Sequence, residues 1–296
     1  MDRPLCIDGH TQLVGLLGYP VEHSLSPAMQ NAAFAAAGLN WCYVPLPVAP
    51  VAVKEAVFGL PALGFRGANV TIPHKQVVMP YLDAVSEEAQ AIGAANVLVF
   101  KDGRRLGYNV DGMGFLTALT SLGVRVRGLR ALVLGAGGSA RAVVYTLARN
   151  GAAVMLLNRT QERAESLVES LRPRLMDEPM GSSLLKSGPL TREVVAEVAS
   201  GIDLVVNTTP LGMSPHEQGN PWPADVPFPR QAVAYDLIYA PRETSFLRLA
   251  KAAGAQTLNG LPMLVYQGAH SFELWTGQPA PIETMYAAVL EGSIQG

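Results

Sequence analysis

The sequence contains very little cysteine, with only Cys6 and Cys42 among 296 residues. Two cysteines cannot build a disulfide scaffold, and their spacing matches no zinc motif. Cys42 lies in the apolar run 41–46, where we expect a small buried hydrophobic side chain. His23 and His74 have no partners at ligand spacing, so no metal site is expected. No acidic pair or Cys/His set indicates a hydrolase.

Charge and long hydrophobic runs are also scarce. Charged residues make up 16% of the chain and the formal net charge is −2, with no dense basic run, which argues against a nucleic-acid partner. The apolar run 13–18 is too short for a signal peptide or a membrane span. We therefore expect a soluble, cytoplasmic protein without a membrane partner. The 49% hydrophobic content and the length suit two domains.

The strongest local pattern spans residues 131–163. An apolar strand at 131–134 leads into a glycine turn, an amphipathic helix that ends at Gly151, and a second strand at 154–157. This is a βαβ unit with the spacing G-x-G-x-x-A, in which glycines let the backbone approach a pyrophosphate at a helix N-terminus. The candidate cofactor-binding residues of this turn are Gly135, Ala136, Gly137, Gly138, Ser139 and Ala140.

The end of the second strand indicates which dinucleotide binds. NAD sites usually place an acid there, but this chain has Asn158, Arg159 and Thr160, with Arg163 one helical step further. Cations and hydroxyl donors suit a 2′-phosphate, whereas an acid would repel it. An arginine is also poorly placed at a helix N-terminus unless an anion lies there. The pattern therefore favours NADP over NAD.

The first part of the chain alternates strands and helices, which indicates an α/β domain. Ser86 is a plausible N-cap for one helix, and residues 101–103 (Lys-Asp-Gly) form a hairpin-type turn. Residues 71–75 are expected to turn the chain into a further helix. The expected strands are 13–18, 41–46, 66–70 and 96–100, and the other expected helices are 27–37, 50–58, 87–92 and 112–122.

The second part continues the dinucleotide-binding domain and then leaves it. Residues 172–190 have no clear period and are expected to be a variable surface loop, while 210–229 is a long proline-rich loop that has a function or is disordered. The helix 262–275 is expected to cross back and pack on the N-terminal domain, followed by a last helix at 282–291. The other expected helices are 161–171, 191–199 and 243–253, and the strands are 203–207, 232–237 and 255–258.

These elements predict a two-domain α/β fold. Residues 1–112 with 260–296 form an N-terminal α/β substrate domain with a mainly parallel sheet, and 113–259 form a Rossmann domain. Three polar clusters in the first domain have an ordinary structural explanation beside a chemical one. Ser24 and Ser26 present two hydroxyls on one side of an extended segment or cap a helix. From the sequence alone, Lys75 is better explained as a surface lysine and Asp111 as a helix N-cap.

Along nearly its whole length the chain resembles shikimate dehydrogenases. The motifs that carry the resemblance occur in order. They are PVEHSLSP at 20–27, GANVTIPHK at 67–75, AAN at 94–96, NVDG at 109–112, GAGGSAR at 135–141, NRT at 158–160, NTT at 207–209, GM at 212–213, and Gln267 after Gly260.

The resemblance implies reversible, NADPH-dependent reduction of 3-dehydroshikimate to shikimate, on the route to chorismate. Lys75 would meet the negative charge that develops on the ketone oxygen, and Asp111 would hold Lys75 in place and bond a ring hydroxyl. Both ligands would meet in a cleft between the domains. The resemblance further implies Ser24, Ser26 and Tyr239 at the substrate carboxylate, Asn69, Thr71, Asn96 and Gln267 at the ring hydroxyls, and Thr208, Met213 and Gly260 on the cofactor side.

Three alternatives differ from this assignment. A quinate/shikimate dehydrogenase that uses NAD, or both cofactors, is disfavoured by Arg159 and Arg163. A non-catalytic shikimate sensor on the same fold is disfavoured by the presence of Lys75 and Asp111. A methylene-tetrahydrofolate-type dehydrogenase shares a two-domain plan, but the SLSP and NVTIPHK segments point away from it. The sequence is compatible with a monomer or a homodimer.

Overall fold

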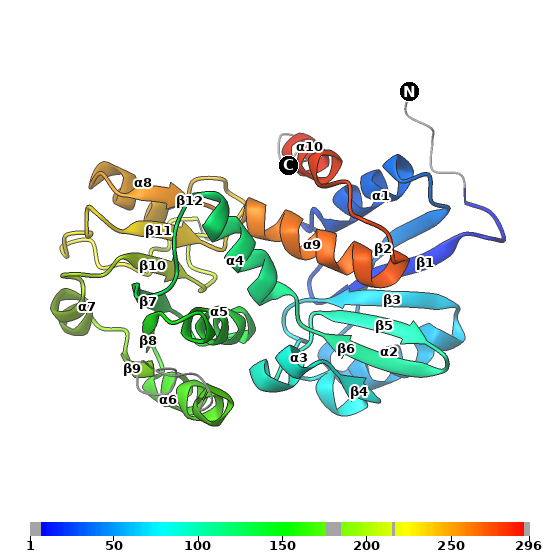
Figure 1. Cartoon of the computed structure of the whole chain (residues 1–296), viewed down its shortest axis with the longest axis horizontal. Coiled ribbons are helices and arrows are strands. Elements are labelled where there is room, and N and C mark those ends of the chain that lie inside the picture. Colours follow the sequence, from blue (N-terminus) through cyan, green and yellow to red (C-terminus); the bar gives the residue numbers. More distant parts are fainter. Residues whose placement is uncertain (1–6, 176–184, 215–216, 293–296) are drawn as a thin grey trace. The chain divides into compact units, whose positions relative to one another are not determined.

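The computed structural model describes residues 7–175, 185–214 and 217–292, so Cys6 lies outside the described residues. Contacts divide the chain into two units: unit 1 comprises 1–114 and 264–296, and unit 2 comprises 115–263. The divisions fall within helices α4 (Asp111–Ser121) and α9 (Leu261–Thr276), a few residues later than the predicted boundaries at 112/113 and 259/260 (Figure 1). None of the helices among the described residues has the length and apolar character needed to span a membrane.

Unit 1 is built on a six-stranded sheet with the order β2-β1-β3-β5-β6-β4. The pairs β1–β2, β1–β3 and β4–β6 are parallel, whereas β3–β5 and β5–β6 are antiparallel. The sheet is therefore mainly parallel with an antiparallel hairpin inserted. Its strands are β1 (Gln12–Gly18), β2 (Trp41–Pro47), β3 (Phe65–Val70), β4 (Ala84–Val85), β5 (Val97–Lys101) and β6 (Arg104–Tyr108).

The first part of the chain does not simply alternate strands and helices as predicted, because β5 and β6 form a hairpin. Asp102 (φ 52°) and Gly103 (φ 73°) both have positive φ, which is the geometry of a two-residue turn between antiparallel strands. The turn was predicted, but β6 after it and the short β4 were not. Both are brief, and β6 begins with two arginines, so neither carries a clear apolar pattern.

The helices of unit 1 are α1 (Ser26–Ala36), α2 (Val53–Ala62), α3 (Glu87–Ile92), α9 and α10 (Ile282–Gly292). Ser86 caps α3 as expected, because its Oγ accepts a hydrogen bond from the backbone N–H of Ala89. The expected helix after residues 71–75 is wrong: the chain makes successive turns and one 3₁₀ turn at Met79–Tyr81. Pro80 has no N–H to donate, which prevents a regular helix from continuing there.

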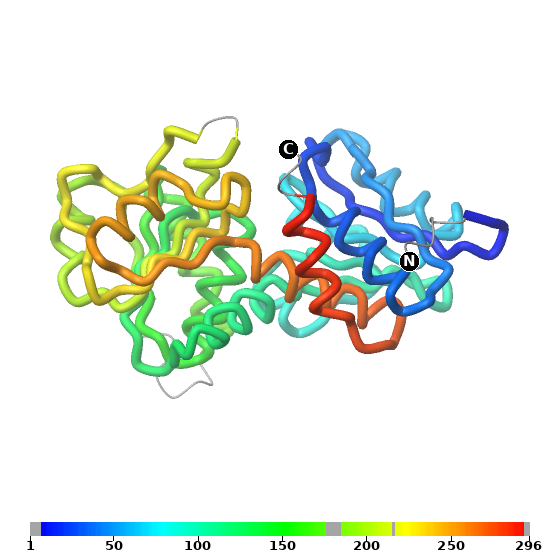
Figure 2. Tube along the Cα trace, turned by 90° about the horizontal axis from the view of Figure 1, so that it is seen from above, coloured from blue at the N-terminus to red at the C-terminus, as the bar shows by residue number. Residues whose placement is uncertain are grey.

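The two faces of strand β3 are covered by different helices. Ala68 and Val70 lie in a core cluster with residues of α2, whereas Gly67 and Asn69 contact α9. This is the period-two alternation of a strand buried on both faces. The helix that was predicted at 262–275 to return to the N-terminal domain is α9, and its residues from 264 onward belong to unit 1. Figure 2 shows α10 alongside α1.

Unit 2 has a six-stranded sheet with the order β12-β11-β10-β7-β8-β9, and all of its pairs are parallel. This strand order is that of a doubly wound Rossmann sheet. The strands are β7 (Arg130–Leu134), β8 (Ala153–Asn158), β9 (Leu185–Pro189), β10 (Leu204–Asn207), β11 (Val233–Asp236) and β12 (Gln256–Leu258). The helices are α5 (Gly138–Arg149), α6 (Gln161–Leu171), α7 (Arg192–Val198) and α8 (Ser245–Ala252), with α4 leading in.

The edge strand β9 overturns part of the expected surface loop at 172–190. Its sequence, LKSGP, has no apolar alternation and contains a glycine and a proline. Both are tolerated at a sheet edge, where one side of the strand needs no partner. Residues 172–175 form a 3₁₀ turn, and residues 176–184 of the predicted loop lie outside the described residues.

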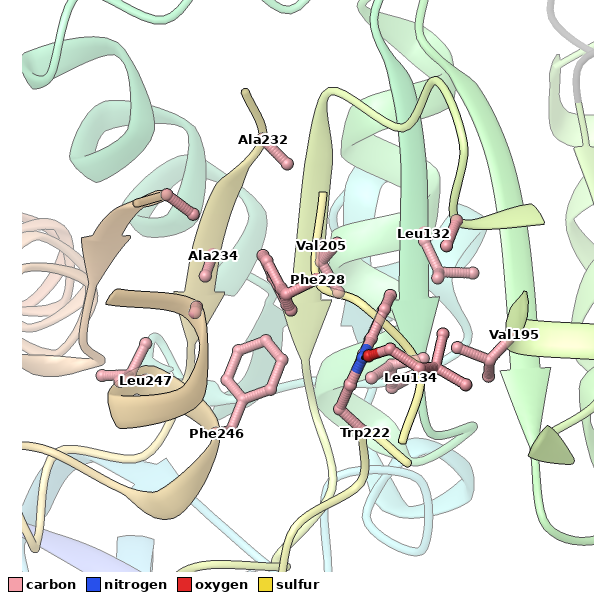
Figure 3. Close-up of a cluster of buried hydrophobic side chains, with 14 of the residues drawn as sticks. Leu132, Leu134, Val195, Val205, Trp222, Phe228, Ala232, Ala234, Phe246 and Leu247 are labelled. Carbon is pink, nitrogen blue, oxygen red and sulfur yellow. The ribbon is translucent and has the colours of Figure 1, made fainter. Parts of the chain in front are cut away.

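The proline-rich segment 210–229 has no helix or strand in its described parts, but Trp222, Val226 and Phe228 belong to a core cluster of unit 2. Trp222 and Phe228 are buried at 2% and 6% exposure, and their rings lie 4.7 Å apart. Figure 3 shows both side chains among residues of the sheet and of α8, including Phe246. This loop therefore supplies apolar side chains that cover one face of the sheet.

Candidate active site

Unit 1 brings Lys75 and Asp111 together. Lys75 Nζ donates a hydrogen bond to Asp111 Oδ2 at 2.5 Å, and the side chains are 13% and 5% exposed. Lys75 lies in the turns after β3, and Asp111 is the first residue of α4. Because Lys75 is largely buried in this ion pair, the surface-lysine explanation is wrong. A buried ion pair also needs further hydrogen bonds to offset its lost hydration.

Asn96 supplies those further bonds. Its Nδ2 donates to Asp111 Oδ1 at 2.8 Å, and its Oδ1 accepts from the Val110 N–H at 2.8 Å. Both ends of the amide are thus used, and Asn96 is only 2% exposed. Each carboxylate oxygen of Asp111 has a donor, which fixes the plane of the carboxylate and with it the direction of Lys75.

The first backbone N–H of α4 is bound by the Asn109 side chain and not by the Asp111 carboxylate. Asn109 Oδ1 accepts from the Asp111 N–H at 3.1 Å, and Asn109 Nδ2 donates to the Ala94 carbonyl at 2.9 Å. The helix-cap explanation for Asp111 is therefore wrong. Its carboxylate instead accepts from Lys75 and Asn96.

The two serines at the start of α1, Ser24 before the helix and Ser26 as its first residue, are arranged differently from the prediction. The segment is not extended, because Leu25 between them has helical angles (φ −81°, ψ −8°). Ser24 Oγ accepts from the Ser26 N–H at 3.2 Å, so one hydroxyl does serve the backbone at the helix start. Ser24 is half-buried and Ser26 is buried.

The remaining substrate candidates occupy several elements. Thr71 is half-buried after β3, where its N–H donates to the Leu17 carbonyl at 2.8 Å. Gln267 is half-buried on α9, and its Nε2 donates to the Leu264 carbonyl at 2.9 Å. Asn69 is buried and engaged in internal hydrogen bonds. Tyr239 lies in unit 2, half-buried after β11.

His74 is a structural residue. It is fully buried, and its Nε2 lies 2.7 Å from the Val48 carbonyl, to which it must donate because a carbonyl can only accept. His23 is exposed. Within the ranges that the structure describes, no group of three or more His, Cys, Asp or Glu residues could hold a metal ion.

In unit 2 the glycine turn joins β7 to α5. Gly135 has φ 103°, and an added Cβ would lie 2.8 Å from both Thr208 Oγ1 and Thr209 Cγ2, so only glycine fits. Gly137 caps α5 without any side-chain hydrogen bond, and the space beside its Cα is open. Ala140 is fully buried against the sheet. Ala136, Gly138 and Ser139 complete the turn and the first helical residues.

This turn fits a dinucleotide pyrophosphate. The first N–H groups of α5 have no side-chain acceptor at the cap, and the first turn carries no acid that would repel phosphate. Thr208 anchors the neighbouring strand end, because its Oγ1 donates to the Leu134 carbonyl at 2.8 Å. These features leave room and donors for an anion beside Gly137.

The end of β8 presents two cations. Arg159 follows Asn158 directly, and Arg163 is the third residue of α6, after Thr160 at the N-cap. Both arginines are exposed, and neither makes an ion pair within the described ranges. Asn158 Nδ2 donates to the Thr160 carbonyl at 2.8 Å, which shapes the turn between them. Two unpaired guanidinium groups beside a helix N-terminus suit a phosphate monoester.

Family models match three successive parts of the chain. They are described as shikimate dehydrogenase substrate binding domain (residues 16–98), shikimate/quinate 5-dehydrogenase (117–181) and shikimate 5′-dehydrogenase C-terminal domain (260–290). A curated relative named shikimate dehydrogenase (NADP(+)), from Moorella thermoacetica, is 49% identical over 280 residues, which cover 94% of this chain and 92% of that protein. The chain belongs to the shikimate dehydrogenase family.

Solved shikimate dehydrogenase structures share the fold. One in complex with NADP⁺ has a TM-score of 0.89 at 41% identity and covers 97% of both chains. Another, from Thermus thermophilus in complex with NADP(H) and shikimate, has a TM-score of 0.84 at 39% identity, covering 95% of this chain and 99% of that one. The predicted two-domain α/β fold is confirmed.

Beyond the family motifs, a buried carboxyl in unit 2 was missed by the sequence reasoning. Asp236, at the end of β11, is fully buried and accepts from Thr244 Oγ1 (2.6 Å), Asn207 Nδ2 (3.0 Å) and the Ile238 N–H (3.0 Å). Burial raises the pKa of Asp236 to about 6 although these hydrogen bonds lower it. Asn207 begins the NTT motif, which was the only sequence signal near this network.

The Asp236 network ties together the loops that carry two predicted site residues. Asn207 Nδ2 also reaches the Leu211 carbonyl at 3.3 Å, two residues before Met213, which is 44% exposed. Tyr239 follows Asp236 by three residues. The last cofactor candidate, Gly260, has its N–H bonded to the Ile238 carbonyl at 3.0 Å, and an added Cβ would clash with the Leu237 carbonyl. Gly260 thus has a clear packing role in unit 2.

Proposed function

We propose that this protein catalyses the reversible NADPH-dependent reduction of 3-dehydroshikimate to shikimate. The observation that carries the proposal is the buried Lys75–Asp111 pair, with Asn96 fixing the carboxylate. The membership in the shikimate dehydrogenase family and the relatives named for NADP(+) support the substrate and the cofactor.

The chemistry requires a proton donor at the substrate oxygen. The cofactor supplies a hydride to the carbonyl carbon, the electron pair of the C=O π bond moves to oxygen, and that oxygen must gain a proton. Lys75 Nζ is the cation that we assign to this oxygen, where it stabilises the developing negative charge and donates the proton. In the direction of shikimate oxidation, Lys75 takes the proton back.

Asp111 and the surrounding polar groups would orient the substrate. Asp111 keeps Lys75 in one direction and accepts from a ring hydroxyl with its remaining lone pairs. Ser24 and Ser26, with Tyr239, would bind the carboxylate, and Thr71, Asn96 and Gln267 would bind the hydroxyls. A polyol acid needs several donors and acceptors at fixed places, which explains why hydroxyl and amide side chains predominate.

The cofactor would be NADP held by unit 2. The glycine turn from Gly135 to Ala140 would receive the pyrophosphate, and Arg159 and Arg163 would receive the 2′-phosphate together with Asn158 and Thr160. Thr208, Met213 and Gly260 would lie on the nicotinamide side. An acidic residue, which would select the ribose hydroxyl of NAD, is absent from residues 158–160.

One assay tests substrate and cofactor together. Reduction of the nicotinamide is followed with shikimate and with quinate, each in the presence of NADP and of NAD. We expect shikimate with NADP to give the highest kcat/KM. A higher kcat/KM for quinate, or for NAD with shikimate, would replace the proposal by the quinate or NAD alternative, and no turnover in any combination would favour a sensor.

A further inference from the structure

Asn69 is a buried amide whose donors are both used inside unit 1. It is 5% exposed, and its Oδ1 accepts from Tyr43 Oη at 2.9 Å. Its Nδ2 donates to the Asn96 carbonyl at 3.2 Å and to Ser271 Oγ at 2.9 Å. Tyr43 is 2% exposed and Ser271 is fully buried. These bonds join strands β2 and β3 to helix α9.

Only one arrangement of protons satisfies these contacts. A backbone carbonyl can only accept, so the side of Asn69 that faces Asn96 must be the amide nitrogen. Its oxygen then faces Tyr43, which must donate. Ser271 Oγ accepts from Asn69, so its own proton goes to the Gln267 carbonyl, 2.9 Å away. The direction of every bond is therefore fixed, and Asn69 cannot rotate without breaking the set.

The hydrogen bonds of Asn69 reach, on two sides, residues that support proposed catalytic and binding side chains. At one end, Asn69 holds the main chain of Asn96, whose side chain holds Asp111 and through it Lys75. At the other end, Ser271 lies one helical turn after Gln267 and bonds its carbonyl. A single buried amide thus touches the supports of both Asp111 and Gln267, from positions separated by 202 residues in the chain.

We propose that Tyr43, Asn69 and Ser271 are positioning residues. They fix the position of helix α9, which carries Gln267, relative to the hydrogen-bonded residues Asn96, Asp111 and Lys75. This inference rests on the proposed function for its kinetic consequences. A displacement of α9 over the sheet would leave these buried polar groups unpaired, which adds a direction-dependent cost to the loss of apolar packing. Asn69 therefore acts by alignment, since both of its donors are engaged away from a ligand.

Neighbouring contacts show that α9 is held in one register. Trp275 Nε1 donates to the Leu98 carbonyl at 3.0 Å, and Gln30 Nε2 donates to the Gly268 carbonyl at 2.9 Å. An added Cβ at Gly67 would collide with the Trp275 ring. These contacts and Ser271 fasten α9 at three successive turns, so the loss of one bond should shift the helix locally rather than release it.

The test uses Ser271→Ala and Tyr43→Phe in the full-length protein. Ser271→Ala leaves one N–H of Asn69 Nδ2 without its acceptor, and Tyr43→Phe removes the donor to Asn69 Oδ1. We expect the KM for shikimate to rise on the order of tenfold in Ser271→Ala, with the KM for NADP unchanged within about twofold. The control is Thr276→Ala, which removes another back-bonding hydroxyl of α9 that does not reach Asn69, and which should leave both KM values unchanged.

The same variants are then combined with Asn69→Ala. If Ser271 acts through its hydrogen bond with Asn69, Ser271→Ala should add no further increase in the KM for shikimate when Asn69 is already replaced by alanine. Additive effects, or a lowered melting temperature with both KM values unchanged in Ser271→Ala, would overturn the positioning role.

Amide exchange separates a failure of this inference from a failure of the proposed function. Should the wild-type protein not act on shikimate, exchange in residues 264–272 still reports the register of α9. Faster exchange there in Tyr43→Phe and Ser271→Ala, but not in Thr276→Ala, supports the positioning role of the Asn69 hydrogen bonds. Wild-type exchange rates in both variants would overturn it whatever the substrate is.

Discussion

Asp236 should make unit 2 less stable as the pH rises toward neutrality. Its carboxyl is fully buried, and burial raises its pKa to about 6 from the ordinary value of 3.8. The folded state then holds a proton between these two values while the unfolded state has lost it. Its stabilising contribution is therefore complete below the unfolded pKa and is lost as the pH rises through about 6.

The size of this effect follows from the shift. A shift of about two units at about 1.4 kcal/mol per unit amounts to about 3 kcal/mol in total, of which about 2 kcal/mol falls between about pH 4.5 and about pH 7.5. Asp236→Asn keeps the shape and can still accept from Asn207 and Ile238, but it cannot ionise. The variant should therefore gain on the wild type by about 2 kcal/mol over that interval.

The assay must report unit 2 alone, since the chain has two units. Amide exchange in peptides that cover β11 and α8, measured across a urea series at both pH values, gives the local free energy of unfolding. Asp225→Asn is the control, whose difference from the wild type should not change between these two pH values. The Arg192 guanidinium lowers the pKa of Asp225, so this exposed group stabilises above its unfolded pKa and loses that contribution as the pH falls. A difference between Asp236→Asn and wild type that does not change with pH would refute the reasoning.

Three further variants test the sites and the core. Lys75→Ala should lower kcat by about 10²–10⁴ with little change in the KM for shikimate, because the proton donor acts in the transition state; near-normal turnover in a steady-state assay would remove Lys75 from catalysis. Arg159→Ala should raise the KM for NADP roughly tenfold to a hundredfold and leave the KM for NAD nearly unchanged, and equal effects on both would contradict the phosphate role. Trp222→Ala should destabilise unit 2 by about 3–5 kcal/mol in urea unfolding, and a loss below about 1 kcal/mol would show that the loop 210–229 does not support the core.

Local patterns explain which parts of the fold could be predicted. The βαβ stretch and helix 161–171 were predicted because their apolar periods and glycine stops lie within a few residues of each other. Strand β9 could not be, because an edge strand tolerates Lys, Ser, Gly and Pro, which look like a loop. Trp222 and Phe228 were missed as core residues because no period connects them; only the folded loop shows that they cover the sheet.

The candidate site, too, could be predicted only in part from the sequence. Lys75 and Asp111 are 36 positions apart, and no spacing rule joins them, so resemblance supplied the pair and the structure supplied the 2.5 Å contact. Tyr43 and Ser271 were missed altogether. A tyrosine in a strand and a serine in a helix have no distinguishing sequence context, and their common partner lies 26 and 202 positions away.

Asn69 and Asn96 show how two identical side chains of neighbouring motifs can divide their work. Resemblance assigned both to the ring hydroxyls of the substrate. Asn96 turns its amide toward Asp111 and Val110, beside the pair that we propose as catalytic. Asn69 instead gives both donors to protein acceptors and its oxygen to Tyr43. A substrate hydroxyl could reach Asn69 only through the second lone pair of that oxygen. The polar density of the motif GANVTIPHK therefore reflects the need to hold a returning helix as well as the need to bind a polyol.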